Sequence, residues 1–423
     1  MTDRHLPEER ARTGEAAAPV RVPPWGALMF GQYRLLMGSG LLSSMGQQMR
    51  EVVNLWVVFQ LTGSALHLGF LGALRVLPLL VIGLFGGVLA DIIDRRRILL
   101  FGKGVSFVLT STLAVLFVTD NLVLWHVYAT TLISTSASVL DGPARMALVH
   151  GSVPRTHMTN AVTMSSVSFH SSVLLGPTLG GLVISVAGVG AAYVINAVFY
   201  VPAMAAVLLL RDVRPAETGP RPRLRRADLL EGLRWVFKTP IVLAFATVDF
   251  AAIIFTSYKV LLPIFAANIL GVGAAGLGFL YAAPAVGFLA GSVVLLTLGD
   301  VPRKGLAVAI GIVGYVASIV VFAVSPWFVL SLIALAASGA FDGVSANIRR
   351  TTVQLLVPDE IRGRATSVVQ VFTRGTSSVG LMGTGAVAAL AGPIFALIGG
   401  GVFALGVLAV VVVRWREILR VRI

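Results

Sequence analysis

The stretch RMALVHGSVPRTHMTNA at residues 145–161 is repeated, without a gap, as RRTTVQLLVPDEIRGRA at residues 349–365. Five positions are identical in the two copies: Arg145 and Arg349, Val149 and Val353, Val153 and Val357, Pro154 and Pro358, and Ala161 and Ala365. The same offset aligns Gly176 with Gly380 and Gly181 with Gly385. Each copy follows the fourth apolar segment of its half of the chain. The sequence therefore predicts two structurally equivalent halves.

Basic residues alternate along the chain in step with these apolar segments. Of the 33 Lys and Arg residues, 29 lie in seven stretches: 1–34, 95–103, 145–155, 211–238, 303–304, 349–364 and 414–422. The intervening gaps hold no Lys or Arg: 61–67, 119–122, 185–190, 267–276, 324–328 and 389–395. Positively charged loops stay on the cytoplasmic side of a membrane. The alternation therefore predicts twelve spans with both termini in the cytoplasm. The membrane that the chain crosses is expected to be the inner cell membrane.

The composition supports an all-α membrane protein. The chain is 57% hydrophobic and 12% charged, whereas about a quarter of a soluble domain is charged. Apolar runs of roughly 20–25 residues are long enough to cross a hydrocarbon core as helices and too continuous for barrel strands. The net charge of +14 is spread over one membrane face, which favours anionic lipid as a partner and disfavours nucleic acid.

The spans and loops divide the chain into five expected parts. They are a disordered tail with the entry to span one (1–34), a six-helix bundle (35–210), a basic linker (211–240), a second six-helix bundle (241–413) and a short tail (414–423). The end of the linker carries apolar residues at helical spacing, which predicts a helix on the membrane surface; the alternative is an extension of span seven. Parallel six-helix repeats are typical of one large transporter architecture.

The loop between spans two and three reads GGVLADIIDRRRIL over residues 86–99. It resembles the loop signature of the major facilitator superfamily, which implies a twelve-helix fold with alternating access. The residues that fit are Gly87, Asp91, Arg95 and Arg96, whereas Ile92 and Asp94 depart from the pattern. The resemblance implies that this cluster latches one access state; the alternative, which we favour for Arg96, is a plain basic loop. A weaker echo in the second half contains Asp300 and Arg303.

Span five contains the segment GPTLGG, made of Gly176, Pro177, Thr178, Leu179, Gly180 and Gly181. It resembles the core of a motif found in drug and metabolite exporters of the antiporter kind. Proline removes a helix hydrogen bond, and glycines let a neighbouring helix approach closely. We therefore assign the segment, with Arg145 and Arg349, to the conformational machinery; the alternative is generic small-residue packing. Residues 59–78, 141–162 and 348–368 resemble secretion-type transporters of the enterobactin-exporter subfamily.

Ionisable residues at membrane depth are costly and point to function. Glu51 lies near the middle of span one, and Asp249 has a related place in span seven. Both are candidates for proton coupling, because a carboxylate in a cavity of low dielectric can take up and release protons. The alternative for each is a fixed ion pair with Arg50, Arg75 or Arg374. Asp141 and Asp342 lie nearer the inner ends of their spans.

A second set of residues could bind the transported molecule. The cations Arg50, Lys259 and Arg374 could bind an anionic group, and three aromatic residues could wall a cavity for an amphipathic molecule: Trp56, Phe250 and Tyr258. His170 is interpreted as a packing residue. The chain has no cysteine, no phosphate-binding loop and no hydrolase motif, so we expect neither an enzyme, a cofactor nor a metal centre.

The resulting hypothesis is a monomeric secondary transporter that exports a drug, siderophore or secreted metabolite in exchange for protons. The substrate is expected to be small and either amphipathic or weakly acidic. The resemblance, and not the composition, implies the energy source. Two alternatives stay open at this point: an importer on the same fold, and a membrane sensor or scaffold that transports nothing.

Overall fold

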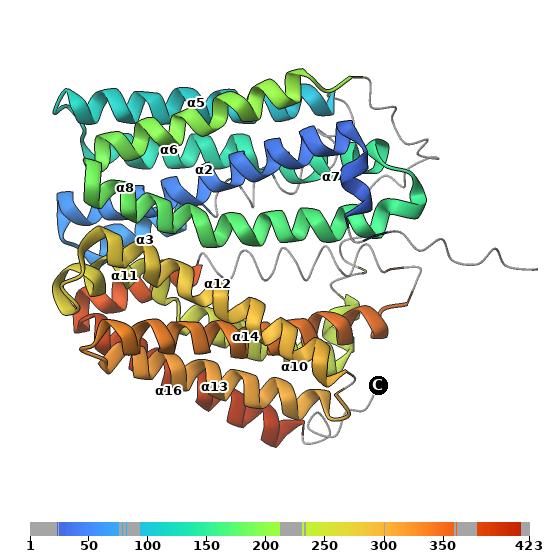
Figure 1. Ribbon diagram of the computed structural model, residues 1–423. Helices are drawn as coiled ribbons and strands as arrows, with labels where there is room; N and C mark the ends of the chain where they lie inside the picture. Colours follow the sequence, from blue (N-terminus) through green and yellow to red (C-terminus); the bar gives the residue numbers. More distant parts are fainter. Residues whose placement is uncertain are drawn as a thin grey trace, which may run out of the picture.

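The computed structural model describes residues 23, 25–75, 78, 82, 94–211, 231, 234–299, 301–358, 361 and 379–415, and over this part of the chain it contains helices and no strands. Figure 1 shows two groups of roughly parallel helices, one from each half of the sequence. An all-helical structure is expected in lipid, because a helix satisfies its own backbone hydrogen bonds. Seven helices of the described part are long and apolar enough to cross a membrane.

The described residues of the first half form four long helical elements and two shorter helices. They are α2 (Gly31–Thr62), α3 (Ala65–Ala73), α5 (Arg95–Val118), α6 (Leu124–Ser138), α7 (Asp141–Ser152) and α8 (Met158–Leu208), with the short 3-10 helices η1 (Gly26–Met29) and η2 (Arg155–His157). Element α8 holds two spans, because the chain reverses at Gly188, where φ is +82°. A positive φ is cheap only for glycine, and the reversal falls in the gap expected at 185–190.

The second half repeats this arrangement. Its elements are α10 (Pro240–Phe255), η3 (Tyr258–Leu261), α11 (Leu262–Ile264), η4 (Phe265–Ile269), α12 (Gly273–Leu298), α13 (Lys304–Val324), α14 (Phe328–Leu356), a helix at Val379–Ala391 and α16 (Pro393–Arg414). Described helical segments thus fall on each of the twelve predicted spans. The all-α fold with two pseudo-symmetric bundles is confirmed.

Span seven is not one continuous helix, because α10 ends at Phe255 and the chain continues through η3, α11 and η4. Pro263 has no N–H to donate to the carbonyl four residues earlier, which belongs to Lys259. The Tyr281 hydroxyl donates to that carbonyl at 2.7 Å instead. The break and its substitute hydrogen bond hold Lys259 at a fixed place, and its side chain is exposed.

The two ends of the bundle differ in character. The basic end carries Arg95–Arg97, the 145–155 connection and Arg303, whereas the neutral end carries the connections near Gly63, Gly188 and Gly271. One apolar cluster of the described residues, called the shared apolar cluster below, joins both halves at the neutral end. The two clusters nearer the basic end belong to one half each. The halves are therefore packed together at the neutral end.

Candidate transport cavity

A cavity of about 1310 Å³ lies between the two halves. Its walls come from α2, α3, α6 and α8 on one side and from α10, η3, α12, α13 and α14 on the other. Val353 and Gln354 line it at the basic end, whereas Leu55 and Tyr281 line it toward the neutral end. Beyond them the fully buried side chains of Leu68, Leu277 and Leu280 pack in the shared apolar cluster. The cavity thus extends toward the basic end and is closed at the neutral end.

The GPTLGG segment lies in the contact that closes the neutral end. A methyl group at Gly176 would come within 2.7 Å of Gln48 Cβ on α2, and one at Gly181 would lie 2.9 Å from Gly278 Cα on α12. Real side-chain carbons do not approach that closely. Gly180 packs likewise against Met49 of α2. The glycines of this motif let α8 touch a helix of its own half and a helix of the other half.

A second glycine contact joins the halves on the opposite side. Gly385, the repeat counterpart of Gly181, lies against Gly69 of α3: a methyl group at Gly385 would be 2.7 Å from Gly69 Cα. Sequence reasoning aligned Gly181 with Gly385 but did not find the partners Gly69 and Gly278. The sequence did contain a feature that points to Gly69, because this glycine lies inside the stretch 59–78 that resembles the secretion-type subfamily.

The first-half carboxylate Glu51 forms an ion pair with Arg75, with 2.6 Å between Oε1 and Nη1. Both residues line the cavity and are partly exposed to it. Arg75 is one of the partners that the ion-pair alternative names. Arg50 also lines the cavity, is buried, and donates to Thr110 Oγ1 at 3.4 Å. In the described part of the chain Arg50 contacts no carboxylate.

The second-half carboxylate Asp249 pairs with Arg349, with 2.6 Å between Oδ1 and Nη2. The same Nη2 lies 3.8 Å from Asp342 Oδ1, and Nη1 donates to Ser345 Oγ at 2.7 Å. Arg349 entered the hypothesis as a conformational residue, and the structure places it in the cavity wall beside two carboxylates. Sequence reasoning did not name it among the partners of Asp249, because the charge pattern places Arg349 in the basic loop 349–364 and not inside a span.

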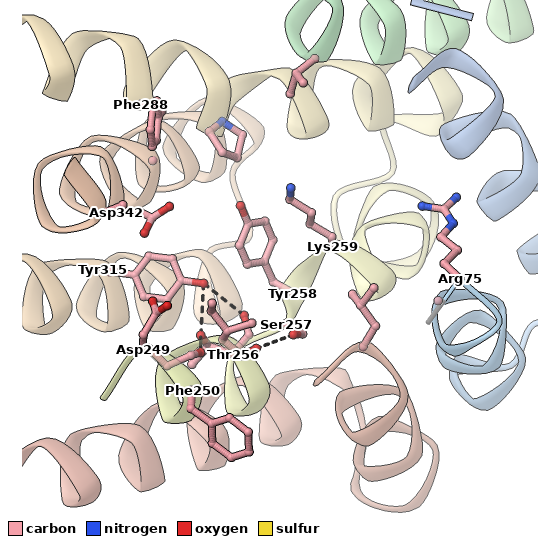
Figure 2. A pocket seen from close by; sticks show the side chains of 18 of the residues that line it. Arg75, Asp249, Phe250, Thr256, Ser257, Tyr258, Lys259, Phe288, Tyr315 and Asp342 are labelled. Atoms are coloured by element: carbon pink, nitrogen blue, oxygen red, sulfur yellow. Dashed lines mark hydrogen bonds between the residues drawn. The ribbon is translucent and has the colours of Figure 1, made fainter. Parts of the chain in front are cut away.

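The remaining substrate-binding candidates separate into two groups. Lys259, Tyr258 and Phe250 line the cavity, and Figure 2 shows Lys259 reaching into the space between Tyr258 and Arg75. No ion pair involves Lys259 within the residues that the structure describes. Trp56 is buried in the shared apolar cluster, with its ring 6.1 Å from that of Phe59, and is not part of the cavity wall. Its side chain packs the bundle instead.

The conformational candidates at the basic end of the bundle contact the ends of helices. Arg96 donates from Nε to the Val207 carbonyl at 3.0 Å and also to the Leu208 carbonyl, near the end of α8. Basic groups are favourable at helix C-termini. Asp94, which departs from the family pattern, caps α5 by accepting from the Arg96 N–H at 2.9 Å. Arg95 and Arg303 lie at the first helical position of α5 and just before α13.

Arg145 packs over Gly40 of α2, and its Nη2 donates to Ser43 Oγ at 3.3 Å. It is not part of the cavity wall. Several candidates lie outside the described residues: Gly87, Asp91, Asp300, Arg374 and most of the linker 211–240 with its expected surface helix.

Comparisons with known proteins identify the family and the fold. A family model described as transmembrane secretion effector matches residues 22–421. The enterobactin exporter EntS of Shigella boydii is 25% identical over 348 residues, 81% of this chain and 80% of that protein. An uncharacterised MFS-type transporter of Bacillus subtilis, YfiS, is 29% identical over 212 residues, 49% of this chain; the match spans half of that relative.

Solved transporter structures share the fold. A bacterial homolog of the human lysosomal transporter Spinster has a TM-score of 0.70 at 14% identity and covers 93% of this chain and 98% of its own. The nucleoside transporter NupG has a TM-score of 0.71 at 13% identity, with 92% and 99% covered. Together with the family model, these matches confirm the resemblance and show a multi-pass membrane transporter, which is not an enzyme. The chain belongs to the transmembrane secretion effector family of major facilitator transporters.

Proposed function

We propose that this protein exports a small, weakly acidic organic molecule from the cytoplasm in exchange for protons. The observation that carries the substrate class is the charge of the cavity wall. In its described part the wall holds five arginine or lysine side chains and three carboxylates: Arg50, Arg75, Lys259, Arg349 and Arg350, and Glu51, Asp249 and Asp342. Each carboxylate lies within 4 Å of an arginine. Arg50, Lys259 and Arg350 have no such partner there, so an anion would balance part of their charge.

The size and lining of the cavity fit a drug-sized amphipathic molecule. Ligand pockets of this kind are mostly apolar with a few convergent polar groups, and Phe250, Phe288 and Tyr258 supply the apolar walls here. The cavity is large enough for a siderophore or an antibiotic. Arg50 on α2 and Lys259 on η3 come from different halves, so one anionic molecule would contact both halves at once.

Export also requires loading from the cytoplasm. If the basic end faces the cytoplasm, as the charge rule predicts, the cavity faces the side from which an exporter takes its substrate. Rocking of the halves that separates the two glycine contacts would then open the neutral end. The enterobactin exporters among the relatives support this direction.

The test uses everted membrane vesicles with a respiration-driven, internally acid pH gradient reported by acridine orange. Added 2,3-dihydroxybenzoate, an aromatic anion, should release protons from vesicles that contain the protein, and tetraphenylphosphonium, an aromatic cation, should not. Glu51→Gln should abolish the response while the protein stays in the membrane, because the amide cannot carry a proton. A response to the cation alone would exclude the anionic class, and an undiminished response of the variant would remove Glu51 from coupling.

A further inference from the structure

Arg349 is shared unequally by two carboxylates. Its guanidinium lies 2.6 Å from Asp249 on α10 and 3.8 Å from Asp342 on α14, its own helix. The first distance is that of a charge-assisted hydrogen bond, whereas the second is outside hydrogen-bonding range. Arg349 therefore binds Asp249 in this state and leaves Asp342 as a second carboxylate that it could reach with a small movement.

The two carboxylates also differ in access to the cavity. The side chain of Asp342 is 50% exposed, whereas those of Asp249 and Arg349 are 18% and 12% exposed. Figure 2 shows Asp342 beside the open space and Asp249 on the other side of the Tyr315 ring. Since the cavity extends to the basic end, protons from that side reach Asp342 before they reach Asp249.

Among the described residues, the two copies of the repeat differ in this arrangement, which is found in the second half. Arg145 is the counterpart of Arg349, and its nearby carboxylate Asp141 stands four residues earlier, where the second half has Ser345. Asp141 pairs with Lys103 at 3.9 Å, and neither residue lines the cavity. The second half has its carboxylates at Asp342 and Asp249 instead, where both face the cavity.

We propose that Asp342 is a proton-carrying group of the transporter and that it competes with Asp249 for Arg349. When Asp342 holds a proton, it has no charge to attract Arg349, which stays on Asp249 and ties α14 to α10. When Asp342 loses the proton to the cavity, its charge draws Arg349 into a pair within α14. The tie between the helices of spans ten and seven is then released.

The charged and titratable groups near Asp342 come from four elements. They are Arg349 and Arg350 on α14, Asp249 on α10, Lys259 and Tyr258 on η3, and Tyr315 on α13. Of the three cations in this group, Arg349 alone is paired with a carboxylate in the described part of the chain, and it can leave that pair for Asp342 on its own helix. The competition rests on the proposed proton exchange and adds a further carboxylate that performs it.

The experiment measures the conformation of the protein in the absence of any transported molecule. The chain has no cysteine, so a spin-label pair at Thr156→Cys and Pro302→Cys, both exposed at the basic end, reports the distance between the halves in nanodiscs by double electron–electron resonance. The wild-type distance should change along a pH titration. Asp342→Asn should shift the midpoint by about one pH unit or more, a tenfold change in proton concentration, or remove the transition.

The control variants distinguish the competition for Arg349 from misfolding and from the transport function. Asp120→Asn makes the same chemical change at an exposed residue of the neutral end and should titrate like the wild type. Asp342→Glu keeps the carboxylate and should restore a transition if the Asn variant is poorly folded. Arg349→Lys should also shift the midpoint, because a single ammonium nitrogen cannot reproduce the two separate nitrogens by which the planar guanidinium contacts Ser345 and the carboxylates. If the wild-type distance does not change with pH, or if Asp342→Asn leaves the midpoint unshifted, the competition for Arg349 is refuted even where anion export is observed. If the midpoint shifts but no anion export is observed, the competition stands and only the anionic substrate class is refuted.

Discussion

Gly385→Ala should shift this transporter away from the state that is closed at the neutral end. The added methyl group would lie 2.7 Å from both Gly69 Cα and the Ala65 carbonyl oxygen of α3. Ordinary van der Waals contact begins near 3.4 Å, so the two helices must separate by roughly 0.7 Å. This contact joins the two halves. The steric cost of the added methyl group therefore raises the free energy only of states in which the two helices touch.

The size of the effect follows from the cost of overpacking. Inserting a methyl group into a tight contact costs about 1–3 kcal/mol, and membrane helices depend on such close packing for association. A bias of about 1–3 kcal/mol changes the population ratio of two states roughly 5- to 150-fold. The neutral end should therefore open that much more often.

The assay is alkylation of one introduced cysteine that is hidden in the closed state. Leu280 is fully buried in the shared apolar cluster, and Leu280→Cys in this cysteine-free chain gives a single reporter. Gly383→Ala is the matched control on the same helix, because a methyl group there meets nothing within 4 Å. The Gly385→Ala protein should react at least about fivefold faster with a membrane-impermeant maleimide than the Gly383→Ala protein. Equal rates in the two would refute the assignment of this contact to the closed state.

Two further predictions concern single side chains. Lys259→Gln should raise the KM for 2,3-dihydroxybenzoate by about tenfold, corresponding to about 1.4 kcal/mol for one lost charge contact, with little change in transport of uncharged cargo; vesicle transport rates check this, and an unchanged KM would exclude Lys259 from anion binding. Asp94→Ala removes the side-chain cap of α5 and should lower stability by about 1 kcal/mol, measured as the melting temperature in detergent, while Asp94→Asn, which still accepts the hydrogen bond, should retain most of the stability.

The sequence is sufficient for the fold because membrane helices leave a strong one-dimensional signal. Apolar length and alternating basic loops do not depend on tertiary contacts, and the repeat pairs Gly181 with Gly385 by residue spacing alone. The break in span seven is also readable from the residues, since Pro263 cannot donate to the Lys259 carbonyl. Span length by itself does not reveal this break, because the apolar run continues through it.

The site is less predictable, because pairing is decided by which helix faces point at each other. The position of Glu51 in span one places it near mid-membrane, but its partner Arg75 is only one of three alternatives that the sequence offers. Trp56 has the type and depth of a wall residue, yet the helix turns it into the apolar cluster. Sequence spacing locates a residue along the membrane normal and says little about its direction around the helix.

The repeat clarifies how two similar halves divide the work of one transporter. Both halves place an arginine near the basic end of their fourth span, and both supply a glycine to the contacts at the neutral end. In the first half the arginine Arg145 rests on Gly40 and Ser43, away from the cavity. In the second half Arg349 lies in the cavity wall between Asp249 and Asp342. The shared backbone thus allows the halves to close the neutral end through equivalent contacts, and the differing carboxylates confine the proposed arginine exchange to the second half.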